Sequence, residues 1–166
     1  PSDQAAAIEA LRPTLADWVD RVAELGLPVT LNHGDLHGHN VFRVGGELRF
    51  FDFADSLLTE PLAALLIPLN VLSGQLDAGP DDPRLWRVVE PALEVWSDLT
   101  PMPALRAALP AALQLGRLAR VESWARCCVS MDDAELAEWG GSVPGWMETL
   151  LLDPPLGRAV GGAGRT

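Results

Sequence analysis

The chain has 166 residues, of which 48% are apolar and 21% charged, and its formal net charge is −11. This length suits one domain with its own hydrophobic core, and the composition argues against a disordered chain. The negative charge argues against binding to nucleic acid and against adsorption on anionic membranes, because both need a basic surface.

The two cysteines, Cys127 and Cys128, are adjacent in the sequence. Neighbouring cysteines rarely form a disulfide, because the short ring that they would close is strained. The chain also has no run of about 18 apolar residues and no basic start followed by an apolar stretch. We therefore expect a cytoplasmic protein that does not associate with a membrane.

Residues 4–25 carry apolar side chains at helical spacing. Pro13 predicts that the helix proper begins near that residue, and Gly26 and Pro28 end it. A short β-type run follows at residues 29–31.

Two further apolar runs, residues 41–44 and 48–51, flank the pair Gly45 and Gly46. A Gly-Gly pair between such runs predicts a tight β-hairpin, because glycine adopts the positive φ angles that the turn needs.

From Thr59 onward the apolar pattern is helical, and proline and glycine interrupt it. The expected helices cover residues 62–72, 83–96, 104–129, 130–139 with Ser130 and Asp133 as a capping pair, and a last segment from Ser142 to just before Asp153. Residues 157–166 are expected to be a flexible tail. The predicted fold class is mainly α with a small β-hairpin (α+β), with residues 1–156 as one lobe.

The candidate chemistry lies on a polar stretch, residues 32–40, and on one later aspartate. A hairpin brings the start of its first strand beside the end of its second, so Asn40 and Asp52 are expected side by side. An amide oxygen and a carboxylate suit Mg²⁺. Asp35, on the same polar loop, is placed to take the proton of a hydroxyl group. This layout predicts phosphoryl transfer, which needs a base for the acceptor and metal ligands at the phosphates.

These residues resemble the phosphotransferase motif of the aminoglycoside phosphotransferase and choline-kinase-like family, whose fold is protein-kinase-like. Residues 33–40 read HGDLHGHN and match the pattern HGDLHxxN. The spacing from Asp35 to Asn40 also equals that of the kinase catalytic loop HRDxxxxN. Asp52 stands where the aspartate of the kinase DFG motif would be. The resemblance covers about residues 29–66.

The resemblance implies a kinase-like C-terminal lobe that transfers the γ-phosphoryl group of ATP or GTP to a hydroxyl of a small molecule, aminoglycoside-like or other. It implies that Asp35 is the catalytic base and that Asn40 and Asp52 bind Mg²⁺ and, through it, the nucleotide. Asp55 is implied as a further metal ligand, and His33 as a brace for the loop.

Two positions depart from the family's pattern. Glu60 lies in a Thr-Glu-Pro run that replaces Gly-Asp-Pro, and Ala64 stands where an aspartate is usual, which removes an expected hydrogen bond to the catalytic loop. The chain also has no lysine and no glycine-rich loop between strands, whereas kinases of this kind hold the phosphates with both. We therefore expect a fragment without its N-terminal nucleotide-binding lobe, with a stand-alone degenerate relative as the alternative. In either case the chain alone should be inactive or weakly active.

Three other interpretations stay open. Without nucleotide-binding machinery, the domain could be a catalytically inactive kinase-like binding module. Residues 34–38 also resemble the first motif of calcineurin-like metallophosphoesterases, although no histidine follows His39 to complete a two-metal centre. His33, His37 and His39 together are a candidate zinc cluster.

The negative charge favours a cationic acceptor. Trp139 and Trp146 lie near Glu138 and Glu148 in the sequence, which makes this region a candidate acceptor pocket; a solvated acidic face is the alternative. The other tryptophans at helical apolar positions are expected to pack in the core; they are Trp18, Trp86, Trp96 and Trp124.

Overall fold

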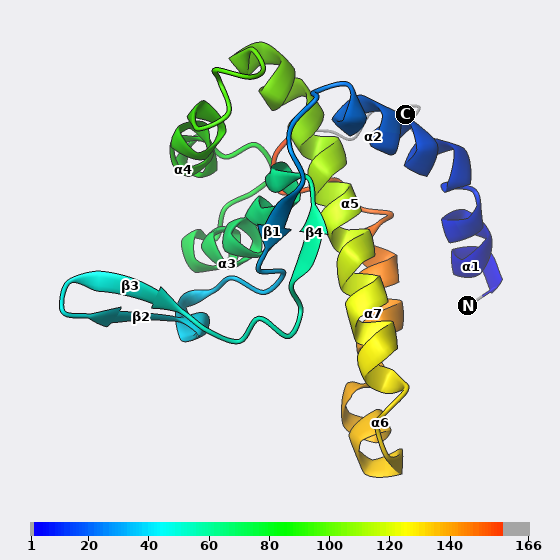
Figure 1. Cartoon of the computed structure of the whole chain (residues 1–166). Helices are drawn as coiled ribbons and strands as arrows, with labels where there is room; N and C mark the ends of the chain where they lie inside the picture. The colour runs from blue at the N-terminus through cyan, green and yellow to red at the C-terminus, as the bar shows by residue number, and fades with distance from the viewer. Residues whose placement is uncertain (1, 158–166) are drawn as a thin grey trace.

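A computed structural model describes residues 2–157 of the chain. Its central element is helix α5 (Met102–Cys128). With the usual rise of about 1.5 Å per residue, this helix is about 40 Å long. Helix α2 (Arg12–Ala23), helix α7 (Ser142–Thr149) and the 3₁₀ turn η2 (Pro61–Leu65) pack along it (Figure 1). One long helix therefore carries the contacts that hold the described chain together.

The other helices surround this central element. They are α1 (Ser2–Glu9) against α7, α3 (Leu66–Leu76) next to η2, α4 (Pro83–Glu94) against α3 and α5, and the short α6 (Asp133–Trp139). Asp82 caps α4, whose first residue is Pro83. The N-cap of α6 is Asp132, which forms a capping box with Glu135, so the prediction that Ser130 caps this helix is wrong.

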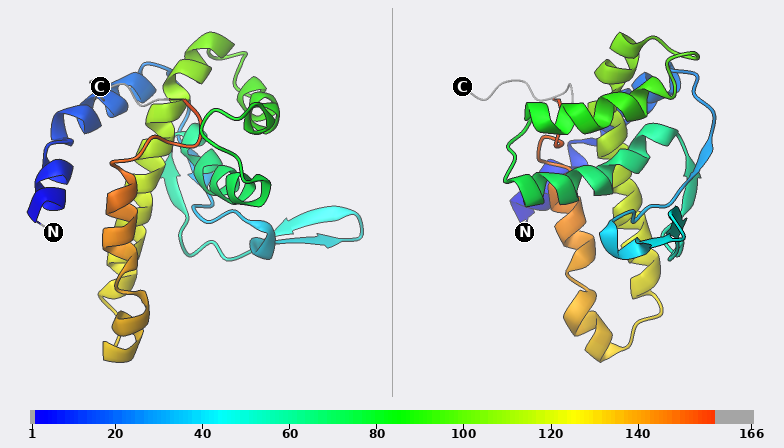
Figure 2. Two further views of the ribbon diagram at one scale, coloured as in Figure 1. Left: turned by 180° about the vertical axis from the view of Figure 1, so that it is seen from behind. Right: turned by 90° about the vertical axis from the view of Figure 1, so that its left-hand side faces the viewer.

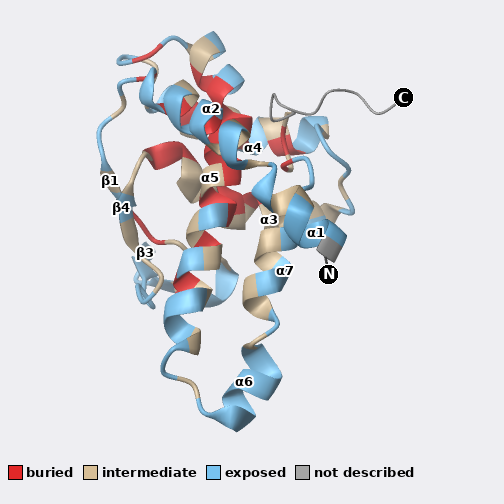
Figure 3. Ribbon diagram, turned by 90° about the vertical axis from the view of Figure 1, so that its right-hand side faces the viewer, coloured by how far each residue is buried: buried red, intermediate tan, exposed pale blue. Residues whose placement is uncertain are grey.

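The hydrophobic core lies around the first half of α5 (Figure 3). Leu105, Leu109 and Leu113 of this helix are fully buried, as are Leu85, Val89 and Leu93 of α4. This spacing of four residues is the apolar stripe by which a helix buries one face. The end of α5 and all of α6 lie outside this core, since α6 has no buried residue.

Two small antiparallel sheets lie along residues 30–59. Strands β2 (Val41–Val44) and β3 (Glu47–Phe50) form the predicted hairpin, with Gly45 at φ +58° and Gly46 at φ +88° in its turn. Strand β1 (Thr30–Asn32) pairs with β4 (Leu57–Thr59), and the sequence did not predict this second pairing. Figure 2 shows the β2–β3 hairpin extending away from the helices.

The prediction of a mainly helical fold with a small hairpin is confirmed for the described residues. The expected helix over residues 62–72 begins as the turn η2 and becomes α-helical only at Leu66. The expected tail covers residues 157–166. Only its first residue belongs to the described residues, and the rest of this prediction lies outside them. Among the helices of residues 2–157, none combines the length and apolar character that a membrane crossing requires.

Shortening a leucine of α5 tests the assigned hydrophobic core. Leu113 is fully buried, so Leu113→Ala should lower the free energy of unfolding by about 3 kcal/mol, through lost burial and the cavity left behind. Urea denaturation followed by circular dichroism measures this change. Leu99 is 62% exposed, and Leu99→Ala should stay within about 0.5 kcal/mol of the parent protein. Equal effects of the two substitutions would contradict the assigned core.

Candidate functional site

The candidate site lies where one long hairpin is interrupted. Register pairs join Thr30 to Thr59 at its base and Val41 to Phe50 nearer its tip. Between these paired regions, residues 33–40 and 51–56 leave the sheet as two facing loops. The backbone N–H of Phe51 donates to the Asn40 carbonyl oxygen at 3.3 Å, so the loops meet at the start of the β2–β3 pair.

Asn40 has a fixed orientation in this arrangement. Its side chain is buried, and its Nδ2 atom donates to the backbone carbonyl oxygen of Asp35 at 2.9 Å. An amide that uses its nitrogen in this way has its Oδ1 atom directed elsewhere, as an acceptor or ligand. The hydrogen bond therefore ties the backbone of Asp35 to Asn40 and leaves one oxygen of Asn40 for chemistry.

His33 connects the two loops. Its Nε2 atom lies 2.8 Å from the Phe51 carbonyl oxygen, which can only accept, so Nε2 carries the proton. Its Nδ1 atom then accepts from the backbone N–H of Asp35 at 3.4 Å. The ring also packs against Phe53, with 4.6 Å between ring centroids. One neutral imidazole thus holds the backbone beside Asp35 against the backbone that precedes Asp52.

Asp35 presents its carboxylate between two basic side chains. Oδ2 lies 3.3 Å from Nε2 of His37, and Oδ1 lies 3.8 Å from an Nη atom of Arg120. The side chain of Asp35 is 28% exposed. The carboxylate is therefore held in place by neighbours and still accessible to a small molecule.

Asp52 lies on the facing loop with an unusual backbone. Its φ is +61°, in the left-handed region that few residues other than glycine adopt. The residue is exposed, and its carboxylate makes no hydrogen bond or ion pair with any described residue. It directly follows Phe51, whose backbone N–H donates to the Asn40 carbonyl oxygen.

Asp55, the third carboxylate of this region, is engaged by α5. Arg120 Nη1 lies 2.7 Å from its Oδ2 atom, and Ser123 donates a hydrogen bond to its Oδ1 atom. Burial by itself raises the pKa of Asp55, but the hydrogen bonds from Ser123 and Arg120 and the charges of Arg120 and Arg126 lower it more. The pKa of Asp55 therefore lies below its ordinary value. Both oxygens serve this contact, which leaves Asp55 poorly placed as a metal ligand.

Gly34 allows the two loops to approach each other. A Cβ atom at this position would lie 2.1 Å from the Asp55 carbonyl oxygen, and Gly34 has φ +80°. Only glycine fits both the contact and the conformation. The HGD motif therefore needs this glycine for packing as well as for its backbone angle.

Other hydrogen bonds partly replace the one that an aspartate at residue 64 would make. Ala64 lines a cavity of about 40 Å³ together with Asp55 and Arg120. Other groups hold the loop of residues 33–40 and the strand before it: Arg120 Nη1 donates to the Gly34 carbonyl oxygen at 3.4 Å, and Asn32 Nδ2 donates to the Glu60 carbonyl oxygen at 2.8 Å. The loop therefore keeps hydrogen bonds to its surroundings without a carboxylate at residue 64.

Sequence reasoning missed Arg120 and Ser123. Arg120 is 7% exposed and its guanidinium lies 5.7 Å from the ring centroid of Trp146, so it is a buried cation with carboxylate and aromatic partners. The available signal was the presence of Arg117 and Arg120 in the expected apolar helix over residues 104–129. A buried arginine needs an anionic or carbonyl partner, but the sequence does not say which one.

The three histidines do not converge on a common point. Both ring nitrogens of His33 are hydrogen-bonded, and Nδ1 of His37 accepts from the backbone N–H of His39 while its Nε2 atom faces Asp35. Within residues 2–157, no group of three or more histidine, cysteine, aspartate and glutamate side chains is arranged to hold a metal ion. The zinc-cluster and two-metal interpretations gain no support from this arrangement.

Comparison of the chain with protein-family models gave no match, and comparisons with curated proteins and with solved structures gave no significant match either.

The pair of Asp55 and Arg120 makes stability depend on pH. Because the pKa of Asp55 is lower in the folded protein than its ordinary value of 3.8, the stabilisation is complete above that value and is lost as the pH falls through the folded pKa. Asp55→Asn should cost about 3 kcal/mol at neutral pH, since it leaves Arg120 buried without its anion. This loss in the free energy of unfolding should become smaller as the pH falls.

Urea denaturation at neutral pH and at several acidic pH values measures this difference. The matched control is Glu47→Gln, which breaks the exposed pair of Glu47 and Arg49 and should cost about 0.5 kcal/mol or less. A cost for Asp55→Asn that did not change with pH would show that the charge of Asp55 does not stabilise the fold.

Proposed function

We propose that this chain is the catalytic and acceptor-binding lobe of a kinase-like small-molecule phosphotransferase. One observation carries the proposal: a base, an amide oxygen and a carboxylate lie on two loops that the same hydrogen bonds hold together. Asn40 binds the backbone of Asp35 through Nδ2 and the backbone of Phe51 through its carbonyl oxygen. Asp52 follows Phe51 directly. The HGDLHxxN pattern described above supports the same function.

The donor set fits Mg²⁺. Oδ1 of Asn40 and the carboxylate of Asp52 are hard oxygen ligands, and neither is used by a described partner. Two protein ligands are typical of Mg²⁺ sites in which nucleotide phosphates and water complete the shell. When bound, Mg²⁺ would neutralise the charge of the phosphates of ATP or GTP. Asp55 contributes by holding Arg120 rather than by binding the metal.

Asp35 is the group that handles the proton. The acceptor hydroxyl oxygen forms a bond to the γ-phosphorus while the bond from that phosphorus to the bridging oxygen of the nucleoside diphosphate breaks. The hydroxyl proton passes to the Asp35 carboxylate, and the diphosphate leaves with the electron pair of the broken bond. His37 and Arg120, one beside each carboxylate oxygen, fix the orientation of Asp35 for this transfer.

The proposal is tested by phosphoryl transfer from radiolabelled ATP and GTP to a panel of hydroxylated small molecules, with the full-length protein as its source cell makes it. Mg²⁺-dependent transfer to an acceptor supports the proposal. Mg²⁺-dependent nucleotide binding with no transfer to any acceptor would favour the binding module instead. Absence of both would remove the kinase interpretation.

Two substitutions separate the assigned roles. Asp35→Ala should reduce kcat by a factor of about 10² to 10⁴, since it removes the base, and should leave nucleotide affinity largely unchanged. Asp52→Ala should weaken Mg²⁺-nucleotide binding itself. Calorimetry at fixed Mg²⁺ and steady-state kinetics measure the two effects.

The matched control is Asp98→Ala, which removes an exposed carboxylate on the loop before α5 and should change neither quantity. Unchanged nucleotide affinity in Asp52→Ala would take Asp52 out of the metal site. Preserved turnover in Asp35→Ala would show that Asp35 is not the base.

A further inference from the structure

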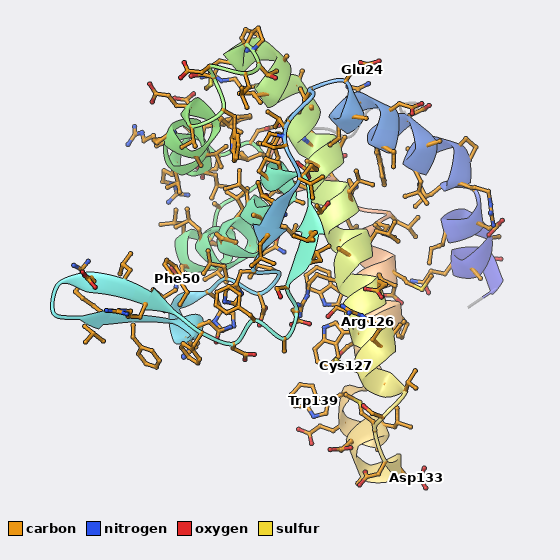
Figure 4. All side chains as sticks on the ribbon, in the orientation of Figure 1. Glu24, Phe50, Arg126, Cys127, Asp133 and Trp139 are labelled. Carbon is orange, nitrogen blue, oxygen red and sulfur yellow. The ribbon has the colours of Figure 1, made fainter. Side chains whose placement is uncertain are left out.

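The last two turns of α5 lie outside the hydrophobic core. Trp124 in these turns is only partly buried and does not belong to the core cluster, so the expectation that it packs in the core is wrong. Its ring stacks on Trp139 of α6 instead, with 6.0 Å between the ring centroids. Figure 4 shows Cys127 on the same stretch of α5, shortly before the chain turns into α6.

Three sulfur-containing residues lie close together at this end of α5. Cys127 and Cys128 are the last two residues of the helix and are free thiols, and Met131 follows three residues later. The backbone continues to turn past the end of the helix. The N–H of Ser130 donates to the Cys127 carbonyl oxygen at 3.1 Å, and the N–H of Met131 donates to the next carbonyl oxygen at 3.4 Å. Met131 therefore lies one turn beyond the two cysteines.

The burial of these residues shows which of them share a face. From residue 124 to residue 139, three residues are half-buried and all the others are exposed. The three are Trp124, Cys128 and Met131, and their spacing of four and three residues is that of one helical face. Cys127 is exposed next to this face. A ligand from solvent can therefore reach the thiols, with the thioether and the indole on the half-buried side.

Two thiols and a thioether are ligands that soft metal ions prefer, and Cu(I) is the clearest case. Side chains three and four residues apart on a helix have Cβ atoms about 5 to 6 Å apart, and a metal–sulfur bond is about 2.3 Å long. One ion can therefore bind Met131 and a cysteine at the same time. The geometry of a disulfide does not suit two adjacent residues of an α-helix, so both thiols stay available.

The surroundings favour Cu(I) over other metal ions. Structural Zn²⁺ takes four ligands, and residues 2–157 hold no group of three or more histidine, cysteine, aspartate and glutamate side chains for it. Hard cations need oxygen ligands, but Asp132 uses its carboxylate to cap α6, and Glu122 pairs with Arg126 at 2.9 Å. The ring face of Trp124 attracts a cation as well.

We propose that Cys127, Cys128 and Met131 form a binding site for Cu(I). The indole ring of Trp124 lies beside the bound ion. Each thiol releases its proton to solvent as its sulfur binds, so two thiolates and one thioether hold the ion. This site goes beyond the proposed function, because none of its residues belongs to the base or to the Mg²⁺ ligands assigned there.

The alternative is that this face serves only to pack α6 against α5. Helix α6 has no buried residue, and the stack of Trp139 on Trp124 already fastens it. The two roles give different results with a metal ion. A packing face binds no Cu(I), whereas the proposed site binds it through both thiols.

The experiment is an anaerobic titration of the reduced, full-length protein with Cu(I), in competition with the chromophoric chelator bicinchoninate. We expect the protein to withdraw one Cu(I) per chain, and to bind Zn²⁺ more weakly by a factor of about 100 or more. Retention of all Cu(I) by the chelator, or an equal affinity for Zn²⁺, would overturn the proposal. One ion shared by two chains, seen in sedimentation as a copper-dependent dimer, would also overturn it.

Substitutions then locate the ion. The double variant, Cys127→Ser with Cys128→Ser, should lower the affinity for Cu(I) on the order of 1,000-fold, because it removes both thiolates. Met131→Leu conserves the side-chain volume and should lower the affinity about tenfold. The matched control is Met102→Leu at the other end of α5, which should bind like the parent. Unchanged affinity in the double variant or in Met131→Leu would overturn the assigned ligands.

Tryptophan fluorescence gives a second measurement of the same site. An ion beside the ring of Trp124 should reduce the emission of the parent protein, and the double cysteine variant should show no such change. Circular dichroism before the titration checks that the variants are folded. Both titrations are done without nucleotide and without acceptor, so their result is independent of phosphoryl transfer.

Discussion

The buried guanidinium of Arg120 joins three parts of the molecule that are far apart in the sequence. It pairs with Asp55, donates to the carbonyl oxygen of Gly34 and lies over Trp146. Removing an arginine from water costs several kcal/mol unless such partners replace the water. The two loops of the site can therefore not separate from α5 without exposing an unpaired charge, and the geometry of the candidate site depends on the helical half of the chain.

The elements that depend on local sequence patterns could be predicted from the sequence. The Gly-Gly pair fixed the β2–β3 hairpin, because the positive φ angles of its turn leave little choice of residue type. The apolar spacing over residues 104–129 predicted α5 within two residues at each end. The meeting of the two loops at Asn40 and Phe51 also followed from the hairpin, since its register places the residues that flank it together.

The rest depends on contacts across long stretches of chain. Strands β1 and β4 are three residues each and pair across the intervening loops and hairpin, so no local pattern predicts their pairing. The partner of Asp55 is 65 residues away, on a face of α5 that periodicity cannot orient toward a loop. Trp124 was wrongly expected in the core for the same reason: it fits an apolar helical pattern, and only the folded chain shows that the core ends before it and that its ring stacks on Trp139.

The projecting hairpin has a consequence for how the protein behaves in solution. Each of its two strands has one edge without a strand partner among residues 2–157, and Phe42, Val44, Leu48 and Phe50 are all about half exposed. Open strand edges with apolar side chains are where chains add to one another. This hairpin is therefore a part of the described chain that is prone to self-association, and charged substitutions at its tip are a direct means of keeping the protein monodisperse at high concentration.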